Sequence, residues 1–204
     1  MELKLIFLLV LIQGFNTYKL NESDAQIECA IFNHLKKDHL FAENLVFESF
    51  QDRDVYTREI PIKYLLNNGI YFKEHKEGLW IFEPAKSLGK NIFLLRNKKY
   101  DEYLYADDSE SRLFVSKTRR EVHTKKIKLS IDKAYVWAIL KTSQSGVFKI
   151  VNMKYGEMLE GEDISKNKIQ LSNKRDCWTS KILDADDKLT NWYLFCHNNA
   201  LPVS

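Results

Sequence analysis

The stretch Gly146-Val147-Phe148-Lys149-Ile150-Val151-Asn152-Met153-Lys154-Tyr155-Gly156-Glu157-Met158-Leu159 has a counterpart 55 residues upstream, from Asn91 to Leu104. Both read as an apolar strand that ends at an asparagine, then a turn, then a second apolar strand. At the same spacing, Trp137 corresponds to Trp192. Such an internal repeat decides the architecture and is therefore considered first. The matched pairs are Phe93/Phe148, Leu95/Ile150, Asn97/Asn152, Tyr100/Tyr155, Glu102/Glu157 and Leu104/Leu159.

A third, more divergent copy precedes these two. Residues 30–42 align with residues 94–106, which places Asn33 on Asn97. The closing tryptophan of this copy is Trp80, 47 residues after Asn33, whereas 40 residues separate the asparagine and tryptophan of the later copies. The first copy therefore carries seven extra residues. The alignment also pairs Asp38 with Glu102, Leu40 with Leu104 and Ala42 with Ala106.

Three copies of one unit predict an all-β fold, a β-trefoil built from three four-stranded repeats at about 29–84, 91–141 and 146–196. We interpret residues 112–116 and 168–172 as the third strands of the second and third repeats. Large apolar residues that alternate along such strands fill the interior, so we expect the loops to carry function. No linker is evident, and residues 18–204 are predicted to form a single β-trefoil domain.

Residues 1–17 have the pattern of a signal peptide: a charged start, an apolar run over residues 5–12 and a polar, small-residue cleavage zone. The apolar run is too short to cross a bilayer as a helix, and we expect no membrane span. The protein is thus predicted to be secreted and extracellular. Its 31 Lys and Arg against 28 Asp and Glu give a net charge of +3, which does not by itself imply nucleic acid, and no nucleic-acid partner is expected.

Secretion makes a disulfide plausible among the three cysteines, Cys29, Cys177 and Cys196. We predict a Cys177–Cys196 bond because both lie in the last repeat, which leaves Cys29 as a small apolar residue of the first strand. The alternative, in which Cys29 ties the first strand to the last, stays open. Asn21 heads an Asn-Glu-Ser triplet and is the predicted glycosylation site.

The sequence lacks the motifs of common active sites. It has no Gly-x-Ser-x-Gly elbow, no glycine-rich phosphate loop and no Cys-x-x-Cys pair. The acidic run at residues 184–187 lacks the ligand order and the glycine of a calcium loop, and we interpret it as solvated. We therefore predict a binding protein with no enzymatic activity, no cofactor and no metal.

A basic stretch between residues 117 and 128 is the strongest local signal for a ligand. We place it in a loop between the third and fourth strands of the middle repeat. Clustered cations bind polyanions through charge and counterion release, and arginine adds bidentate contacts to sulfate. The partner would be an anionic, heparin-like glycan or an extracellular protein; the alternative is a basic face that serves solubility. The candidate polyanion-binding residues are Lys117, Arg119, Arg120, Lys125, Lys126 and Lys128.

The pattern Trp137…Phe148-Lys149-Ile150-Val151-Asn152…Tyr155…Leu159…Trp192 resembles the C-terminal trefoil domain of the insect low-molecular-weight (thirty-kilodalton) haemolymph lipoproteins and microvitellogenin. The resemblance covers residues 78–196 and implies a trefoil that binds sugars or glycans outside the cell. Those proteins carry a helical domain ahead of the trefoil, for which this chain has little room. Small trefoils are also at home among the salivary proteins of blood-feeding insects, an analogy at the level of fold.

Two other functional classes stay open. A carbohydrate or lipid carrier of haemolymph type would hold its ligand in an aromatic pocket outside the core, with Tyr103, Tyr105 or Trp178 in its wall. A trefoil protease inhibitor would use an exposed loop. Ricin-type lectins close each unit with Gln-x-Trp, but the residues two before the tryptophans here are Gly78, Tyr135 and Thr190, so that galactose site is not carried over.

Overall fold

The computed structural model describes residues 26–44, 52–60, 74–111, 119–127, 131–162, 174–181 and 188–196. Several predicted features lie outside these ranges: the signal peptide, the Asn21 glycosylation site, the strands expected at 112–116 and 168–172, and the acidic run at 184–187. Within the described part of the chain, no helix is long and apolar enough to cross a membrane.

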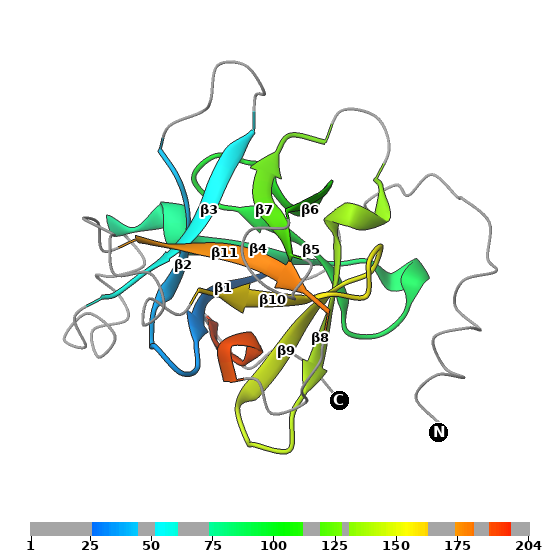
Figure 1. The fold of residues 1–204 in the computed structure, drawn as a ribbon. Helices are drawn as coiled ribbons and strands as arrows, with labels where there is room; N and C mark the ends of the chain where they lie inside the picture. Colours follow the sequence, from blue (N-terminus) through cyan, green and yellow to red (C-terminus); the bar gives the residue numbers. More distant parts are fainter. Residues whose placement is uncertain are drawn as a thin grey trace.

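The described residues form β-strands joined by turns and short 3-10 turns (Figure 1). Four strands recur in each of three successive segments, as the repeat predicted. The first repeat holds β1 (Ile27–Asn33), β2 (His39–Ala42), β3 (Arg53–Arg58) and β4 (Leu79–Pro84). The second holds β5 (Ile92–Asn97), β6 (Tyr103–Ser111), β7 (Arg119–Lys125) and β8 (Val136–Lys141). The third holds β9 (Val147–Asn152), β10 (Met158–Gly161), β11 (Lys174–Ser180) and β12 (Trp192–Cys196).

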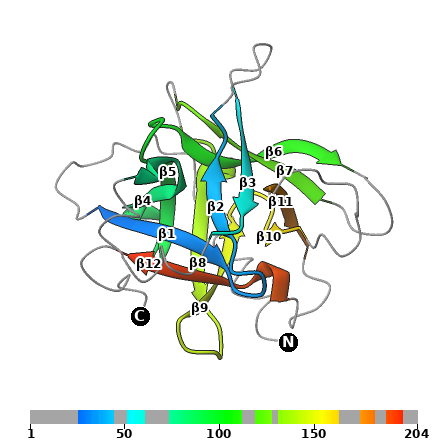
Figure 2. The same ribbon diagram turned by 90° about the vertical axis from the view of Figure 1, so that its left-hand side faces the viewer.

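The first and fourth strands of the repeats close into a barrel. Antiparallel pairing runs around the ring β1–β4–β5–β8–β9–β12 and returns from β12 to β1. Figure 2 shows β1 and β12 lying side by side where the ring closes. Closure leaves no unpaired barrel edge, which removes the aggregation hazard of an open sheet. This ring of six strands with three hairpins is the β-trefoil.

The second and third strands of each repeat form a hairpin, and the three hairpins together make a cap over the barrel. Their third strands meet in a triangle, because β3 pairs with β7, β7 with β11, and β11 with β3. In the described residues the third strands run from Arg119 and from Lys174, while the strands predicted at 112–116 and 168–172 lie outside these residues. Residues 119–125 of the basic stretch, predicted to be a loop after a third strand, are therefore themselves the third strand β7.

The three closing tryptophans fill the centre of the molecule. Trp80, Trp137 and Trp192 are fully buried, and each donates its indole N–H to a backbone carbonyl of the second strand in its own repeat. The acceptors are Leu40, Leu104 and Leu159, at 3.1, 2.9 and 3.0 Å. Burial of such a ring with its N–H satisfied avoids the cost of an unpaired donor.

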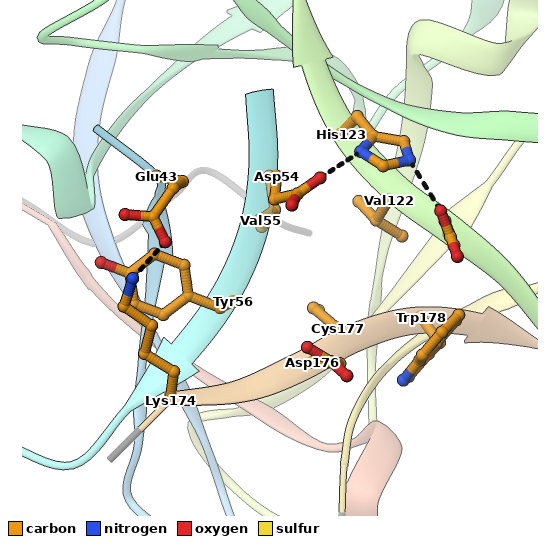
Figure 3. A pocket seen from close by; sticks show the side chains of 11 residues that line it. Glu43, Asp54, Val55, Tyr56, Val122, His123, Lys174, Asp176, Cys177 and Trp178 are labelled. Carbon is orange, nitrogen blue, oxygen red and sulfur yellow. Dashed lines mark hydrogen bonds and ion pairs between the residues drawn. The ribbon is translucent and has the colours of Figure 1, made fainter. Parts of the chain in front are cut away.

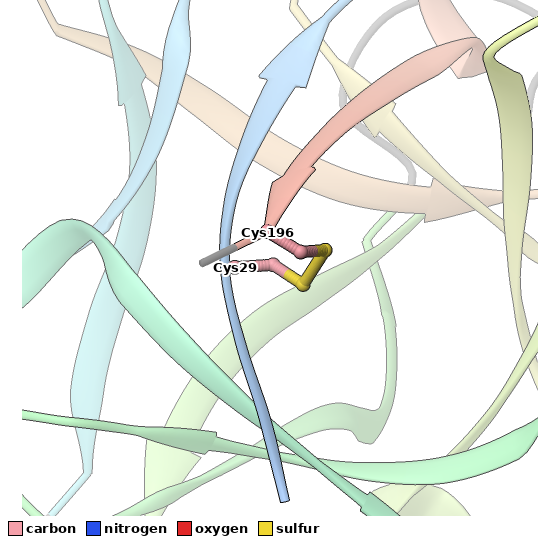
Figure 4. Close-up of a disulfide and its surroundings, with 2 residues drawn as sticks. All are labelled: Cys29 and Cys196. Carbon is pink, nitrogen blue, oxygen red and sulfur yellow. A yellow bond between two sulfur atoms is a disulfide. The ribbon is translucent and has the colours of Figure 1, made fainter. Parts of the chain in front are cut away.

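Cys29 on β1 is bonded to Cys196 on β12, so the predicted Cys177–Cys196 pair is wrong (Figure 4). The two bonded residues lie directly opposite each other in the antiparallel register of the first and last strands. Cys177 belongs to the same repeat as Cys196, but it lies on the cap strand β11 as a buried free thiol. Barrel closure, rather than proximity in sequence, selects the partners.

Candidate functional site

The basic stretch does not form an open cationic face in the structure. Arg120 is 7% exposed, and its guanidinium donates to Glu157 at 3.2 Å and to Glu110 at 2.6 Å. Arg119 donates to the fully buried Glu160 at 2.7 Å. The placement of these two arginines in a polyanion-binding loop is therefore corrected: they lie on a strand and neutralise buried carboxylates.

The other predicted cations divide into one that is paired, one that is exposed and two outside the described ranges. Lys125 forms an ion pair with Asp52 at 2.9 Å. Lys126 is exposed. Lys117 and Lys128 belong to the residues that the structure does not describe. Three of the four described cations thus already have a carboxylate partner, which lowers their availability for an anionic glycan.

Arg120 belongs to a five-residue pattern that occurs once in each repeat. The pattern is Arg, an acid, Val or Cys, a ring-bearing residue and Thr. It covers residues 53–57 on β3, 120–124 on β7 and 175–179 on β11. In the triangle of third strands, the Arg of one copy lies opposite the Thr of the next: Arg53/Thr124, Arg120/Thr179 and Arg175/Thr57. The three copies therefore pair with one another in a cycle.

Each arginine of the pattern forms an ion pair with the acid that immediately precedes another repeat's second strand. Arg53 holds Glu102 in a two-pronged contact at 2.9 and 3.2 Å, and Thr124 donates to the same carboxylate at 2.8 Å. We call the three pairs Arg53–Glu102, Arg120–Glu157 and Arg175–Asp38 the ion-pair ring. Each pair joins two different repeats, and removal of one partner would leave a buried charge.

The middle three residues of the pattern surround a cavity of about 200 Å³ in the cap (Figure 3). Val55, Val122 and Cys177, the third position of each copy, are buried and also belong to the hydrophobic core. We define the cap cavity by its lining residues: Glu43, Asp54, Val55, Tyr56, Glu121, Val122, His123, Lys174, Asp176, Cys177 and Trp178.

Acids and rings alternate around the cap cavity. The register places the acid of one strand opposite the ring of the neighbouring strand in all three contacts: Asp54/His123, Glu121/Trp178 and Asp176/Tyr56. Directly opposed residues of an antiparallel pair have their Cβ atoms about 4.5–5.5 Å apart. The fold therefore brings three carboxylates and three different rings to one place, although they are far apart in sequence.

Two basic side chains, Lys174 and, when it is protonated, His123, offset part of this negative charge. Lys174 forms an ion pair with Glu43, and His123 lies between Asp54 at 3.0 Å and Glu121 at 3.3 Å (Figure 3). Burial acts to lower the pKa of His123, but the hydrogen bond to Asp54 and the nearby carboxylates raise it above its ordinary value. Proton binding to His123 is therefore favoured by the acids that surround it.

Asp176 has no such partner. Asp176 as a whole residue is exposed, but the cavity walls partly desolvate its carboxyl and so raise its pKa above the ordinary value, and the charge of Asp54 raises it further. In the part of the chain that the structure describes, no cation pairs with the Asp176 carboxylate. Its charge is left uncompensated within the cap cavity.

Of the three aromatic residues predicted for a ligand pocket, one lines the cap cavity. Trp178 is 9% exposed, and its indole Nε1 has no hydrogen-bond partner among the described residues. The hydroxyl groups of the other two are committed elsewhere: Tyr103 donates to Glu83 at 3.0 Å and Tyr105 to Asp52 at 2.7 Å. The structure thus keeps Trp178 as a candidate and gives Tyr103 and Tyr105 structural contacts.

The cap cavity does not have the ligand set of a metal site. No group of three or more His, Cys, Asp or Glu side chains among the described residues is arranged to hold a metal ion. Cys177 donates its thiol to the Glu160 carbonyl, and burial raises its pKa well above the usual range. A protonated, buried thiol is a poor nucleophile and a poor metal ligand.

The basic stretch considered alone does not indicate the residues that line the cap cavity. The signal that could have revealed it is the recurrence of Arg-Glu-Val-His-Thr at residues 120–124 as Arg-Asp-Val-Tyr-Thr at 53–57 and Arg-Asp-Cys-Trp-Thr at 175–179. The recurrence is not evident when Arg119 and Arg120 are considered only as part of a local cluster of charge. Alignment of the three copies shows that Arg120 is equivalent to Arg53 and Arg175.

Neither a protein-family model nor a curated protein matches the sequence. Solved structures do match. The designed threefold-symmetric protein ThreeFoil has a TM-score of 0.58 at 13% identity, over 82% of this chain and 96% of its own. A salivary protein of Culex quinquefasciatus from the cysteine and tryptophan-rich family has a TM-score of 0.57 at 16% identity, over 87% and 98%.

SeviL, solved with the asialo-GM1 saccharide bound, has a TM-score of 0.51 at 12% identity, over 84% of this chain and 98% of its own. At these identities the likeness shows the fold alone. The predicted β-trefoil is confirmed, whereas the specific resemblance to the haemolymph lipoproteins stays a prediction.

Proposed function

We propose that this protein is a secreted, non-enzymatic binding protein that takes its ligand at the cap cavity. A contrast between two kinds of threefold-equivalent position carries the proposal. Positions of the five-residue pattern that hold the fold keep one residue type, Arg or Thr, in all three repeats. The ring position instead carries Tyr56, His123 and Trp178. Three different rings give a symmetric scaffold one asymmetric surface, as a specific ligand requires.

Other observations support the parts of this proposal. The Cys29–Cys196 disulfide fits a protein that folds in an oxidising compartment, as secretion requires. The protonated Cys177 thiol favours binding over nucleophilic catalysis. SeviL, which has the same fold, was solved with a saccharide bound, and a fold of this kind can therefore present a ligand site on its surface.

A thermal-shift panel tests the proposal. The purified mature protein is heated with heparin, with a neutral oligosaccharide and with an organic amine. A ligand present at many times its Kd should raise Tm by several degrees, because it binds the folded state alone. Trp178→Ala should abolish the shift, whereas Glu74→Gln, at an exposed residue outside the cap cavity, should keep it. A shift that survives Trp178→Ala would place the site elsewhere.

Binding of an anionic glycan stays a second prediction, supported in the described part of the chain by the exposed Lys126. Retention on heparin tests it, with Lys117, Lys126 and Lys128 changed together to Glu. Elution well above physiological salt, lost in the variant, would support this function. Equal, weak retention of both proteins would indicate that these lysines do not bind heparin and serve solubility instead. Arg120 is left unchanged because its ion pairs hold the cap and its loss is expected to destabilise the fold.

A further inference from the structure

We infer that the cap cavity recognises an organic cation, a protonated amine or a guanidinium group, held between the Asp176 carboxylate and the Trp178 ring. This inference rests on the proposed binding function and adds the chemical class of the ligand. Charge, ring chemistry and size each point to that class.

The acids that line the cap cavity outnumber its basic side chains, and among them Asp176 is the one with no described cation partner. Lys174 is matched to Glu43, and His123 is shared by two acids. Asp176 faces the like charge of Asp54, and no described cation pairs with it. A bound cation would stabilise the ionised form of Asp176 and reverse the upward shift of its pKa, which is a favourable interaction available to a cation and not to an anion.

The aromatic rings of the cap cavity also include one, Trp178, that has no described cation over its face. Lys174 lies over the Tyr56 ring, 4.7 Å from its centroid, and His123 is itself the third ring. Trp178 has no cation over its ring among the described residues, although indole is the strongest cation-binding ring. Its unpaired Nε1–H is a second, independent sign of a missing partner, since buried donors are normally hydrogen-bonded. A cation with a neighbouring oxygen atom would supply both interactions.

The size of the cap cavity limits the ligand to a small head group. Sites for drug-sized molecules occupy about 300–1,000 Å³, and this cavity is about 200 Å³. The cation is thus either a free small amine or the end of a lysine or arginine side chain on another protein. Both sources would present a positively charged ammonium or guanidinium group.

Isothermal titration at pH 7.5 tests the inference with two pairs of probes. The first pair is phenethylamine and its uncharged counterpart 2-phenylethanol. The second is N-acetyl-lysine-N-methylamide and the same compound acetylated on Nζ. We expect at least one cationic probe to bind and its neutral counterpart to bind at least tenfold more weakly. Binding of phenethylamine would identify a free amine as the ligand, and binding of N-acetyl-lysine-N-methylamide would identify a protein side chain.

Three variants place the ligand within the cap cavity. Asp176→Asn removes the carboxylate at an exposed position where folding should tolerate it, and it should weaken cation binding roughly 10- to 100-fold. Trp178→Leu should also weaken it, while Glu74→Gln, which removes an equal charge elsewhere, should not. A circular-dichroism melt of each variant confirms that the fold is intact.

The inference is overturned if neither cation binds, if charged and neutral probes bind alike, or if Asp176→Asn binds like the wild type. These failures are distinguishable from failure of the proposed function. A thermal-shift ligand that requires Trp178, combined with no binding of either cation, would keep the binding function and reject the cation. A panel with no ligand dependent on Trp178 would reject both.

Discussion

Three asparagines show at the scale of single residues why the repeat keeps certain side chains. The Oδ1 of Asn152 accepts from the backbone N–H of Lys154 and Tyr155, and its Nδ2 donates to the carbonyl of Ala134 at 2.7 Å. Asn33 and Asn97 make the same contacts, in each case to the 3-10 turn that precedes the fourth strand of another repeat. An amide is required because this site needs a donor and an acceptor in one side chain.

Asn152→Asp should therefore destabilise the protein despite its equal size. The change replaces a buried N–H donor with an oxygen that faces the Ala134 carbonyl, and we expect a loss of about 1–3 kcal/mol in the free energy of unfolding. Urea denaturation followed by circular dichroism measures it. Asn44→Asp, at an exposed asparagine, is the control and should change stability little. Equal stability of the two variants would contradict this account of the repeat.

His39 gives a residue-scale prediction for pH. The ring is fully buried, lies 2.6 Å from the Gly78 carbonyl and is stacked on Phe32, and burial lowers its pKa to about 3. Between pH 6.5 and 3 the unfolded state binds a proton that the folded state does not. His39 therefore makes the folded state lose about 1.4 kcal/mol per pH unit as pH falls through this window.

His39→Gln removes this titration and should flatten the decline in stability below pH 6.5, as urea midpoints at pH 7.0, 5.5 and 4.5 would show. Titration of carboxylates is common to both proteins and cancels in the comparison. Parallel curves for variant and wild type would mean that His39 is protonated in the folded state. His123 acts in the opposite sense, because its raised pKa stabilises the fold below pH 6.5, and that contribution is lost as pH rises through the folded pKa.

At the scale of elements, β7 shows that a basic segment can be structural. Arg120 pairs with Glu157, which is fully buried, and also lies over the Tyr155 ring at 3.9 Å. Arg120→Ala should cost about 3–5 kcal/mol because it leaves a buried carboxylate unpaired. Lys126→Ala, at an exposed lysine six residues along the chain, should stay within about 0.5 kcal/mol of the wild type. Chemical denaturation of both variants checks the contrast. If the Arg120 variant kept full stability, the ion-pair ring would have no structural role.

The joint between β1 and β12 gives a second prediction for elements. The Cys29–Cys196 bond spans 167 residues, and closure of so long a loop restricts the unfolded chain strongly. Reduction should lower the free energy of unfolding by about 5 kcal/mol on the chain-entropy model. Denaturation with and without reductant measures the effect, and Cys177→Ala should show the same dependence on reductant. Peptide mapping that found a Cys177–Cys196 bond would overturn the assignment.

The whole molecule determines how the cap cavity should respond to pH. Its carboxylates come from three repeats, and a protonated His123 would offset one of the two negative charges of Asp54 and Glu121. Tyr105 and Asp107 of β6, Glu121 of β7 and Asp54 of β3 face the imidazole. As pH rises through its raised pKa, His123 loses its proton and the cavity becomes more negative. Affinity for an organic cation should thus increase with pH.

Titration of phenethylamine from pH 5.5 to 8.5 tests this dependence. His123→Gln should bind the amine more tightly than the wild type at low pH and should lose most of the pH response. A response that is unchanged in the variant would assign it to other groups, such as Asp176.

The sequence by itself determined the architecture. Three asparagine turns, three tryptophans and the spacing between them predicted a β-trefoil with the correct repeats, because side-chain alternation and turn chemistry are local properties. Local pattern also supplied Trp178 as a candidate for a ligand pocket. It could not supply the partners of Arg120 or the bond of Cys29, since both depend on residues that another repeat brings into contact.

Tertiary structure alone decided those pairings. Closure of the barrel placed Cys29 opposite Cys196, and the triangle of third strands turned a basic segment into buried ion pairs and an acidic, ring-lined cavity. The physical reason is that charge and reactivity depend on burial and on neighbours, which a closed β structure takes from distant parts of the chain. Three residues of the predicted cationic patch, Arg119, Arg120 and Lys125, form three separate contacts in the folded protein.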